Sequence, residues 1–80
     1  MAAVTFPDAL LTLTAGQREI EISAANYREL LEALEERFTG LREQLEAMAV
    51  AIDGQIYQDA FLEPLQVNSE VFFMQRIESG

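Results

Sequence analysis

The segment NYRELLEALEERF, residues 26–38, carries the clearest periodic pattern in the chain. Its apolar side chains recur at intervals of three and four residues, which places them along one face of an α-helix. Asn26 is a suitable N-cap, and Glu29 three positions later completes a capping-box pattern that satisfies free backbone N–H groups. Gly40 can adopt the left-handed conformation that ends a helix. We therefore predict a helix over residues 27–38 whose core-facing stripe is Tyr27, Leu30, Leu31, Leu34 and Phe38.

Two strands are predicted before this helix. Residues 3–6 alternate between apolar and polar and end at Pro7, and residues 18–23 alternate cleanly, with Ile20 and Ile22 on one face. The turn signal Ala15-Gly16-Gln17 lies between them, so an antiparallel hairpin with an irregular connection is expected. Residues 9–14 fit either a helical turn or a loop packed on the core.

Three further strands are predicted after the helix. A helical turn over residues 41–46 would return Leu41 and Leu45 to the core, and a strand over 48–52 would meet a short strand over 55–58 through Asp53-Gly54. In the loop over 59–65, Leu62 and Leu65 are expected at the edge of the core. The last strand, over 71–77, is apolar on both faces in its first half, which favours a central place in a covered sheet.

This order of elements predicts an α+β domain with the β-grasp (ubiquitin-like) plan. A mixed sheet of four to five strands would wrap one main helix, and the first and last strands would pair in parallel at its centre. We expect a single β-grasp domain over residues 1–77 and a flexible C-terminal tail over 78–80.

Composition excludes several classes of function. The 80 residues carry a net charge of −9 and contain no Cys, His or Lys, so disulfides, the usual metal and acid–base ligands, and Schiff-base chemistry are absent. Nucleic acid and anionic membranes would repel such a chain, whereas a partner with a basic docking face would suit it. No targeting or membrane-spanning pattern is visible. We expect a cytoplasmic protein that is not an enzyme, with no catalytic or metal-ligating residues.

The chain resembles the MoaD/ThiS family of ubiquitin-like sulfur carrier proteins over essentially all its length. Each matching segment is short, but their order and spacing agree with the family, and the Phe6-Pro7 start and residues 14–17 are similar to carriers that serve cysteine synthesis. The matching segments are Val4-Thr5-Phe6, the helix with Phe38, the Leu41 segment, Ala51-Ile52-Asp53-Gly54 and Pro64-Leu65-Gln66-Val67-Asn68-Ser69-Glu70-Val71, followed by Phe72-Phe73 and a tail of the family's length.

The resemblance implies a role for the C-terminus. In the family, an E1-like adenylating enzyme uses ATP to activate the carboxylate of a terminal Gly-Gly, and a sulfur donor converts the adenylate to a thiocarboxylate. Gly80 matches the last glycine, whereas Ser79 replaces the first, after Glu78 in the tail. Glycine suits a tail that threads a narrow channel because it lacks a Cβ. Gln75-Arg76 also replaces the family's proline-rich lead-in.

The resemblance also implies partners rather than bound cofactors. The chain itself would bind no cofactor, and its partners would be the E1-like enzyme and a sulfurtransferase or acceptor synthase, with no nucleic acid and no membrane. Residues of the last strand and its continuation would contact them, and the free protein would be a monomer. The expected partner-binding residues are Phe72, Met74, Arg76 and Ile77.

Other functions stay open at this point. The chain could be a divergent β-grasp interaction domain that has lost carrier chemistry, as Ser79 favours, or a modifier conjugated through Gly80. An independent hydrolase is disfavoured, because Glu35 and Glu36 diverge on the predicted helix and fit a solvated face. The acceptor pathway is open among molybdopterin, thiamine, cysteine and thiolated RNA bases.

Overall fold

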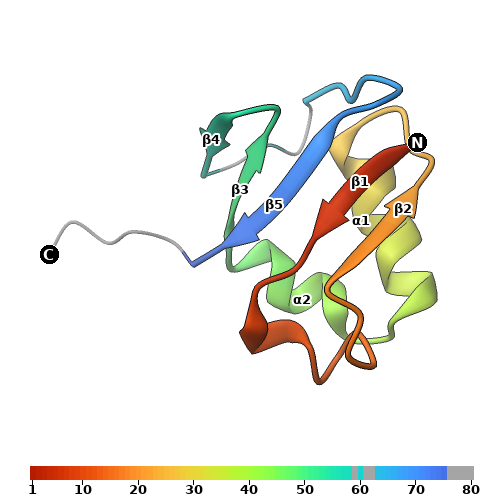
Figure 1. Ribbon diagram of the computed structural model, residues 1–80, viewed down its shortest axis with the longest axis vertical. Helices are drawn as coiled ribbons and strands as arrows, with labels where there is room; N and C mark the ends of the chain where they lie inside the picture. Colours follow the sequence, from red (N-terminus) through yellow and green to blue (C-terminus); the bar gives the residue numbers. More distant parts are fainter. Residues whose placement is uncertain (59, 61–62, 76–80) are drawn as a thin grey trace, which may run out of the picture.

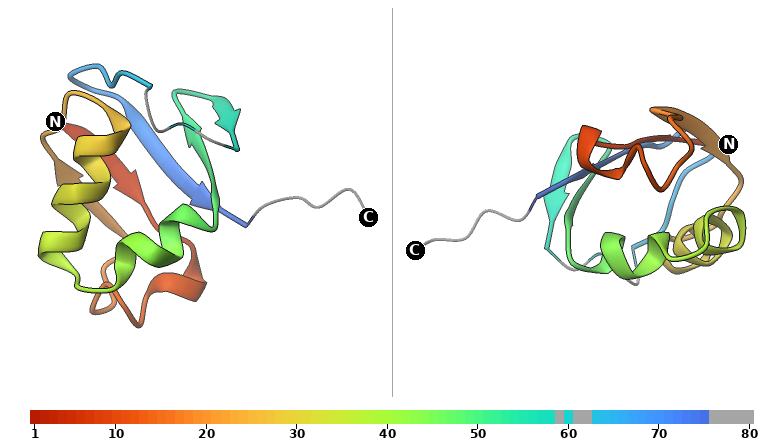
Figure 2. Two further views of the ribbon diagram at one scale, coloured as in Figure 1. Left: turned by 180° about the vertical axis from the view of Figure 1, so that it is seen from behind. Right: turned by 90° about the horizontal axis from the view of Figure 1, so that it is seen from below.

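A mixed sheet forms one layer of the molecule and two helices cover one of its faces, as the computed structural model shows (Figure 1). The structure describes residues 1–58, 60 and 63–75. Helices α1 (Tyr27–Arg37) and α2 (Leu41–Glu46) lie together on the same side of the sheet, which Figure 2 shows from behind and from below. The opposite face of the sheet has no helix of the described chain over it.

The sheet has five strands in the order β2-β1-β5-β3-β4. The first and last strands pair in parallel at the centre, with Val4 opposite Val71, and the other neighbours are antiparallel. This is the β-grasp architecture, which confirms the predicted fold class. The strands are β1 (Ala2–Thr5), β2 (Glu19–Ile22), β3 (Ala49–Ile52), β4 (Gln55–Tyr57) and β5 (Glu70–Met74), and a 3-10 turn, η1 (Asp8–Leu10), follows β1.

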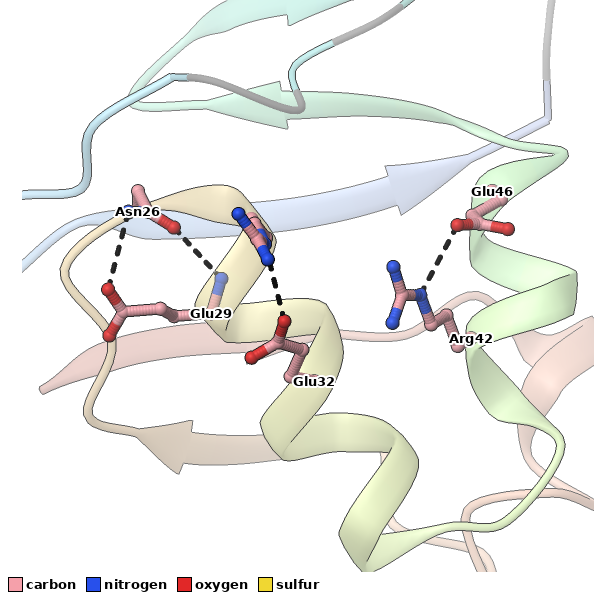
Figure 3. Close-up of polar contacts among 6 residues, drawn as sticks. Asn26, Glu29, Glu32, Arg42 and Glu46 are labelled. Carbon is pink, nitrogen blue, oxygen red and sulfur yellow. Dashed lines mark hydrogen bonds and ion pairs between the residues drawn. The ribbon is translucent and has the colours of Figure 1, made fainter.

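Helix α1 begins as its sequence predicts. The Asn26 side-chain oxygen accepts a hydrogen bond from the backbone N–H of Glu29 at 2.9 Å, and the Asn26 amide donates to the Glu29 carboxylate at 3.3 Å (Figure 3). Phe38 caps the other end, and Gly40 has a φ of 92°, in the left-handed region. This conformation turns the chain directly into α2, whose buried Leu41 and Leu45 return to the core as expected.

The core lies between the helices and the covered face of the sheet. Phe73 of β5 stacks on Phe6 with ring centroids 6.1 Å apart, and the Tyr27 ring of α1 is tilted against the Phe73 ring, also with centroids 6.1 Å apart. Leu65 closes the edge of the core as expected, while Leu62 lies outside the described residues. The most deeply buried large side chains are Phe6, Leu30, Leu31, Leu34, Leu41, Leu45, Val4, Val50 and Val71.

The structure corrects one part of the sequence interpretation. β5 is central, as predicted, but it begins at Glu70 and ends at Met74, and Gln75 is not part of the strand, whereas residues 76 and 77 of the expected strand lie outside the described residues. It is also covered on one face only, because Val71 and Phe73 are buried whereas Phe72 is 45% exposed. Parallel pairing with β1 and antiparallel pairing with β3 make it central, and neither requires a second covering layer.

The remaining differences are short shifts at the ends of elements. The first strand runs from Ala2, the third begins at Ala49, the fourth ends at Tyr57, and α1 stops at Arg37. Phe6, expected inside the first strand, lies just beyond it and is still buried. The predicted domain end at residue 77 and the tail over 78–80 lie outside the described residues.

Candidate functional site: the open face of the sheet

One row of side chains crosses the uncovered face from edge to edge. The strand register makes Phe72 of β5 the neighbour of Thr5 on β1 and of Ala51 on β3. Thr5 is in turn opposite Glu19 on β2, and Ala51 is opposite Ile56 on β4. Alternate side chains of a strand point to opposite faces, so the row that shares the face of exposed Phe72 is Glu19, Thr5, Phe72, Ala51 and Ile56.

The β5–β3–β4 half of this face is apolar. Ile56 is 61% exposed and Phe72 is 45% exposed, while Met74 is half-buried beside Ala49 on the next row. Ala51 lies between Phe72 and Ile56 in the row and is itself buried, with 9% of its surface exposed. We call these four residues the apolar patch (Phe72, Ala51, Ile56 and Met74). Contiguous exposed apolar side chains on a small domain mark interaction surfaces more often than isolated ones do.

The β2–β1 half of the face, together with the start of β5, is acidic. Glu19 and Glu21 lie on the outward side of β2, and the register places Glu70 beside Ala3, which is opposite Glu21. We call Glu19, Glu21 and Glu70 the acidic flank. All three residues are exposed, and none of their carboxylates forms an ion pair with a residue that the structure describes.

The described arginines are placed elsewhere. Arg28 and Arg42 form ion pairs along their own helices at 3.3 Å, with Glu32 and Glu46 respectively (Figure 3). Arg18, next to the acidic flank in sequence, pairs with Asp8. Arg37, at the end of α1, has its guanidinium carbon 5.9 Å from the centroid of the Phe38 ring. The open face is therefore negatively charged on one side and apolar on the other.

A hydrogen-bonded turn fixes the start of β5 and hence the position of the patch. Asp53 (φ 50°) and Gly54 (φ 88°) form the β3–β4 turn. One Asp53 carboxylate oxygen accepts from the Glu70 backbone N–H and the other from the buried Ser69 hydroxyl, both at 2.9 Å. The Asp53 N–H donates to the Glu70 carbonyl at 2.9 Å. The sequence identified the turn but not these long-range contacts.

Glu35 has a structural role in the helical layer. Its carboxylate accepts hydrogen bonds from the backbone N–H groups of Gly40 at 2.9 Å and Arg42 at 3.0 Å. These two bonds, first that of Gly40 and then that of Arg42, hold the pKa of Glu35 below its usual range. Glu35 therefore satisfies N–H groups at the start of α2, which the sequence interpretation as a merely solvated face did not anticipate.

The described residues contain little else that could carry chemistry. Across residues 1–58, 60 and 63–75, no group of acidic, His or Cys side chains could hold a metal ion. No helix of that part of the chain is long and apolar enough to span a membrane. A shallow depression of about 270 Å³ near Met1, Ala24, Leu65 and Val67 shares no residue with the apolar patch.

The structure places only two of the predicted site residues. Phe72 and Met74 lie on the open face, whereas Arg76, Ile77, Glu78, Ser79 and Gly80 lie outside the described residues. Sequence reasoning missed Ile56 as a member of this surface. Its signal was weak, because a three-residue strand next to a turn shows too little alternation to assign a face.

Comparison with known proteins gives a result at the level of structure alone, because no protein-family model and no curated protein sequence matches the chain. A chain of the crystal structure of the Amycolatopsis orientalis BexX/CysO complex superposes with a TM-score of 0.87 at 17% identity, covering 100% of both chains. Mycobacterium tuberculosis CysO, an antigen, gives 0.86 at 15% identity, covering 96% of this chain and 100% of CysO.

A third similar structure is the complex of subunits 1 and 2 of molybdopterin-converting factor from Helicobacter pylori. One of its chains matches with a TM-score of 0.67 at 20% identity, covering 99% of this chain and 97% of that one. At these identities the likeness shows a shared fold. The fold expected from the sequence resemblance is thus present over the full length of the chain.

Proposed function

We propose that the chain is a sulfur carrier of the MoaD/ThiS type, a protein cofactor that works with partner enzymes and is not itself an enzyme. The observation that carries the proposal is the full-length likeness to CysO, seen with BexX in one complex, at a TM-score of 0.87. The sequence resemblance points independently to the same family. A fold by itself hosts many functions, so the proposal rests on this likeness together with the sequence resemblance, in which Gly80 matches the last glycine of the family.

The proposed chemistry takes place at the Gly80 carboxylate. An oxygen of this group attacks the α-phosphate of ATP on an E1-like enzyme, which forms an acyl adenylate and releases pyrophosphate. A persulfide sulfur then attacks the acyl carbon, AMP leaves, and an acyl disulfide forms. A second thiol cleaves that disulfide, so that the carrier leaves as a thiocarboxylate and the two partner sulfurs become a disulfide.

This scheme asks little of the carrier's own side chains. The chain has no Cys, His or Lys, so nucleophile, acid–base groups, nucleotide site and metal all belong to the partners. The carrier supplies a terminal carboxylate and a recognisable rigid surface. We assign that surface to Phe72 and Met74, with Arg76 and Ile77 continuing it toward the tail. A cytoplasmic location and a monomeric free state are part of the proposal.

Ser79 is the residue that most directly tests how the tail is used. A serine adds a Cβ and a hydroxyl where the family has glycine, so the partner's channel must accept both. Ser79→Gly should leave activation unchanged or increase it if the channel is narrow at this point. Gly80→Ala, which adds a methyl group beside the reacting carboxylate, should reduce activation much more.

The test is the intact mass of the carrier after co-expression with the E1-like enzyme and the sulfurtransferase of the same genome. A working carrier gains the mass difference between one sulfur and one oxygen, mapped to Gly80 by fragmentation, and deletion of Gly80 abolishes the gain. The control is a Gly-Gly carrier proven active with the same enzymes. No gain in this chain beside a gain in the control contradicts the proposal.

A second candidate function is a β-grasp interaction domain without carrier chemistry. Ser79 in place of the penultimate glycine favours it. In that case the open face would still bind a partner, whereas deletion of residues 78–80 would leave the affinity unchanged. Affinity of the truncated and full-length chains for the same partner therefore separates the two candidates.

A further inference from the structure

We infer that the open face docks onto a protein surface in which basic side chains adjoin an apolar area, in one orientation. The basic groups cover the acidic flank (Glu19, Glu21 and Glu70), and the apolar area covers the apolar patch (Phe72, Ala51, Ile56 and Met74). The inference rests on the proposed function, because it takes the activating enzyme as the occupant. It adds the chemistry of that enzyme's docking surface and the direction in which the carrier sits.

The two halves of the face are close enough to be covered together. Neighbouring strands lie about 4.8 Å apart, so the row from Glu19 to Ile56 across the five strands spans roughly 19 Å. An ordinary protein interface covers about 800 Å² on each partner, which is wide enough for this row and the next. Phe72 lies two strands from Glu19, or about 10 Å, so a partner that buries Phe72 reaches to about one Debye length, ~8 Å, from Glu19.

The charges decide what kind of partner fits. Removing a carboxylate from water without a compensating cation costs free energy, and the flank has no ion-pair partner among the described residues. The partner must supply that compensation, since Arg28, Arg37 and Arg42 belong to the helical layer and Arg18 is paired with Asp8. Arginine or lysine beside an apolar area provides it and also speeds association.

The same charges disfavour a second copy of this chain as the occupant. A symmetric dimer would place one protomer's open face on the other's, so that acidic flanks of the same sign would approach each other or cover an apolar patch. The net charge of −9 adds a longer-range repulsion between copies. Like charges that face each other across an interface weaken binding, so they act against a second copy of this chain as the partner.

The separation of acidic and apolar residues on the open face also sets the direction of docking. Along β5, acidic Glu70 comes first and apolar Phe72 and Met74 follow, so the apolar end of this strand is the end that leads to the C-terminus. Across the sheet, the acids lie on β2 and the exposed Ile56 lies on β4. The basic groups of the partner should therefore lie on the side of its docking surface that is distant from the site that receives the carboxylate.

Matched charge reversals test the inference. Glu19→Arg with Glu21→Arg reverses two charges of the flank, and Glu36→Arg with Glu43→Arg makes the same net change on exposed positions of the helical layer. Calorimetric titration with the purified E1-like enzyme of the same genome, without ATP, should show at least about tenfold weaker binding for the first pair and a change within about threefold for the second. The affinity of the wild-type chain should fall with added salt, and that of the flank variant should not. Glu19→Gln with Glu21→Gln, which keeps the strand's shape, should give a smaller loss in the same direction.

The outcomes separate this inference from the proposed function. If the two charge reversals change the affinity equally, and the enzyme still exchanges pyrophosphate into ATP with the wild-type carrier, the inference is overturned and the proposed function stands. Charge-selective binding without any exchange supports the inference and contradicts the function. No binding of the wild-type chain, or a concentration-dependent dimer that Phe72→Ala abolishes, overturns the inference, because then the enzyme is not the occupant of this face.

Discussion

Replacing Phe73 by alanine should strongly destabilise the domain, whereas the same replacement at Phe72 should be tolerated. The two residues are neighbours on the central strand and differ in which face they occupy. Phe73 is 4% exposed, and its ring contacts those of Phe6 and Tyr27 at centroid distances of 6.1 Å each. Phe72 is 45% exposed on the open face.

The expected costs follow from these environments. Truncating a buried phenylalanine costs about 3–5 kcal/mol, because the lost transfer free energy adds to that of the cavity. A domain of this length has a free energy of unfolding of roughly 4–12 kcal/mol, at about 0.05–0.15 kcal/mol per residue. Phe73→Ala therefore removes a quarter or more of it. Phe72→Ala removes about half of a side chain's burial, or roughly 1 kcal/mol, and leaves no closed cavity.

The assay is urea unfolding followed by far-ultraviolet circular dichroism. Both variants are compared with the wild type, provided that the free energy of unfolding has the same slope against urea concentration in all three. Equal slopes are needed because the slope reports the surface exposed on unfolding, and a change in it would signal a different unfolded or native state. A loss for Phe72→Ala as large as that for Phe73→Ala would refute the one-sided sheet. It would also remove the basis for treating Phe72 as a contact surface.

Three further predictions concern the polar contacts and turns. Asp53→Ala should lower the free energy of unfolding by about 1–3 kcal/mol, because the buried Ser69 hydroxyl and the Glu70 N–H lose their acceptor; thermal unfolding of this variant against Ser69→Ala measures it. The pKa of Glu35 is lowered in the folded state, so the stability that Glu35 contributes is present above the ordinary pKa of a glutamic acid and is lost as pH falls through the folded value. Glu35→Gln should therefore make the free energy of unfolding depend less on pH in that acid range. An unchanged pH dependence would contradict this role. Gly40→Ala should cost about 1–2 kcal/mol by urea unfolding, since its φ of 92° is unfavourable for a residue with a Cβ even though the added methyl group meets no atom within 4 Å.

The sequence predicted the elements that local rules govern. The helical stripe from Tyr27 to Leu34 and the alternation at Ile20 and Ile22 each depend on a spacing that a single segment contains. Asp53-Gly54 and Gly40 were found because their conformations have strong residue preferences, and both have a positive φ. The central parallel pair followed from the order of these elements.

Features that depend on several distant segments were harder to predict. Exposure of Phe72 could not be read from β5, because an apolar residue on a strand fits both a covered and an open face. Ile56 belongs to the same surface only through the β3–β4 register. The bonds from Glu35 to the start of α2 depend on how the chain turns at Gly40, which no spacing rule specifies.

The parallel pairing of β1 with β5 also determines how the domain resists force. The two strands are adjacent and run in the same direction, so the start of the chain and the end of β5 lie at opposite ends of the pair (Figure 1). Tension applied between those points slides one strand lengthwise past the other and loads their hydrogen bonds together, instead of opening them one after another. A pull on the chain beyond Met74 against a held N-terminus therefore loads the β1–β5 pair in shear, and separating the two strands requires their hydrogen bonds to break together.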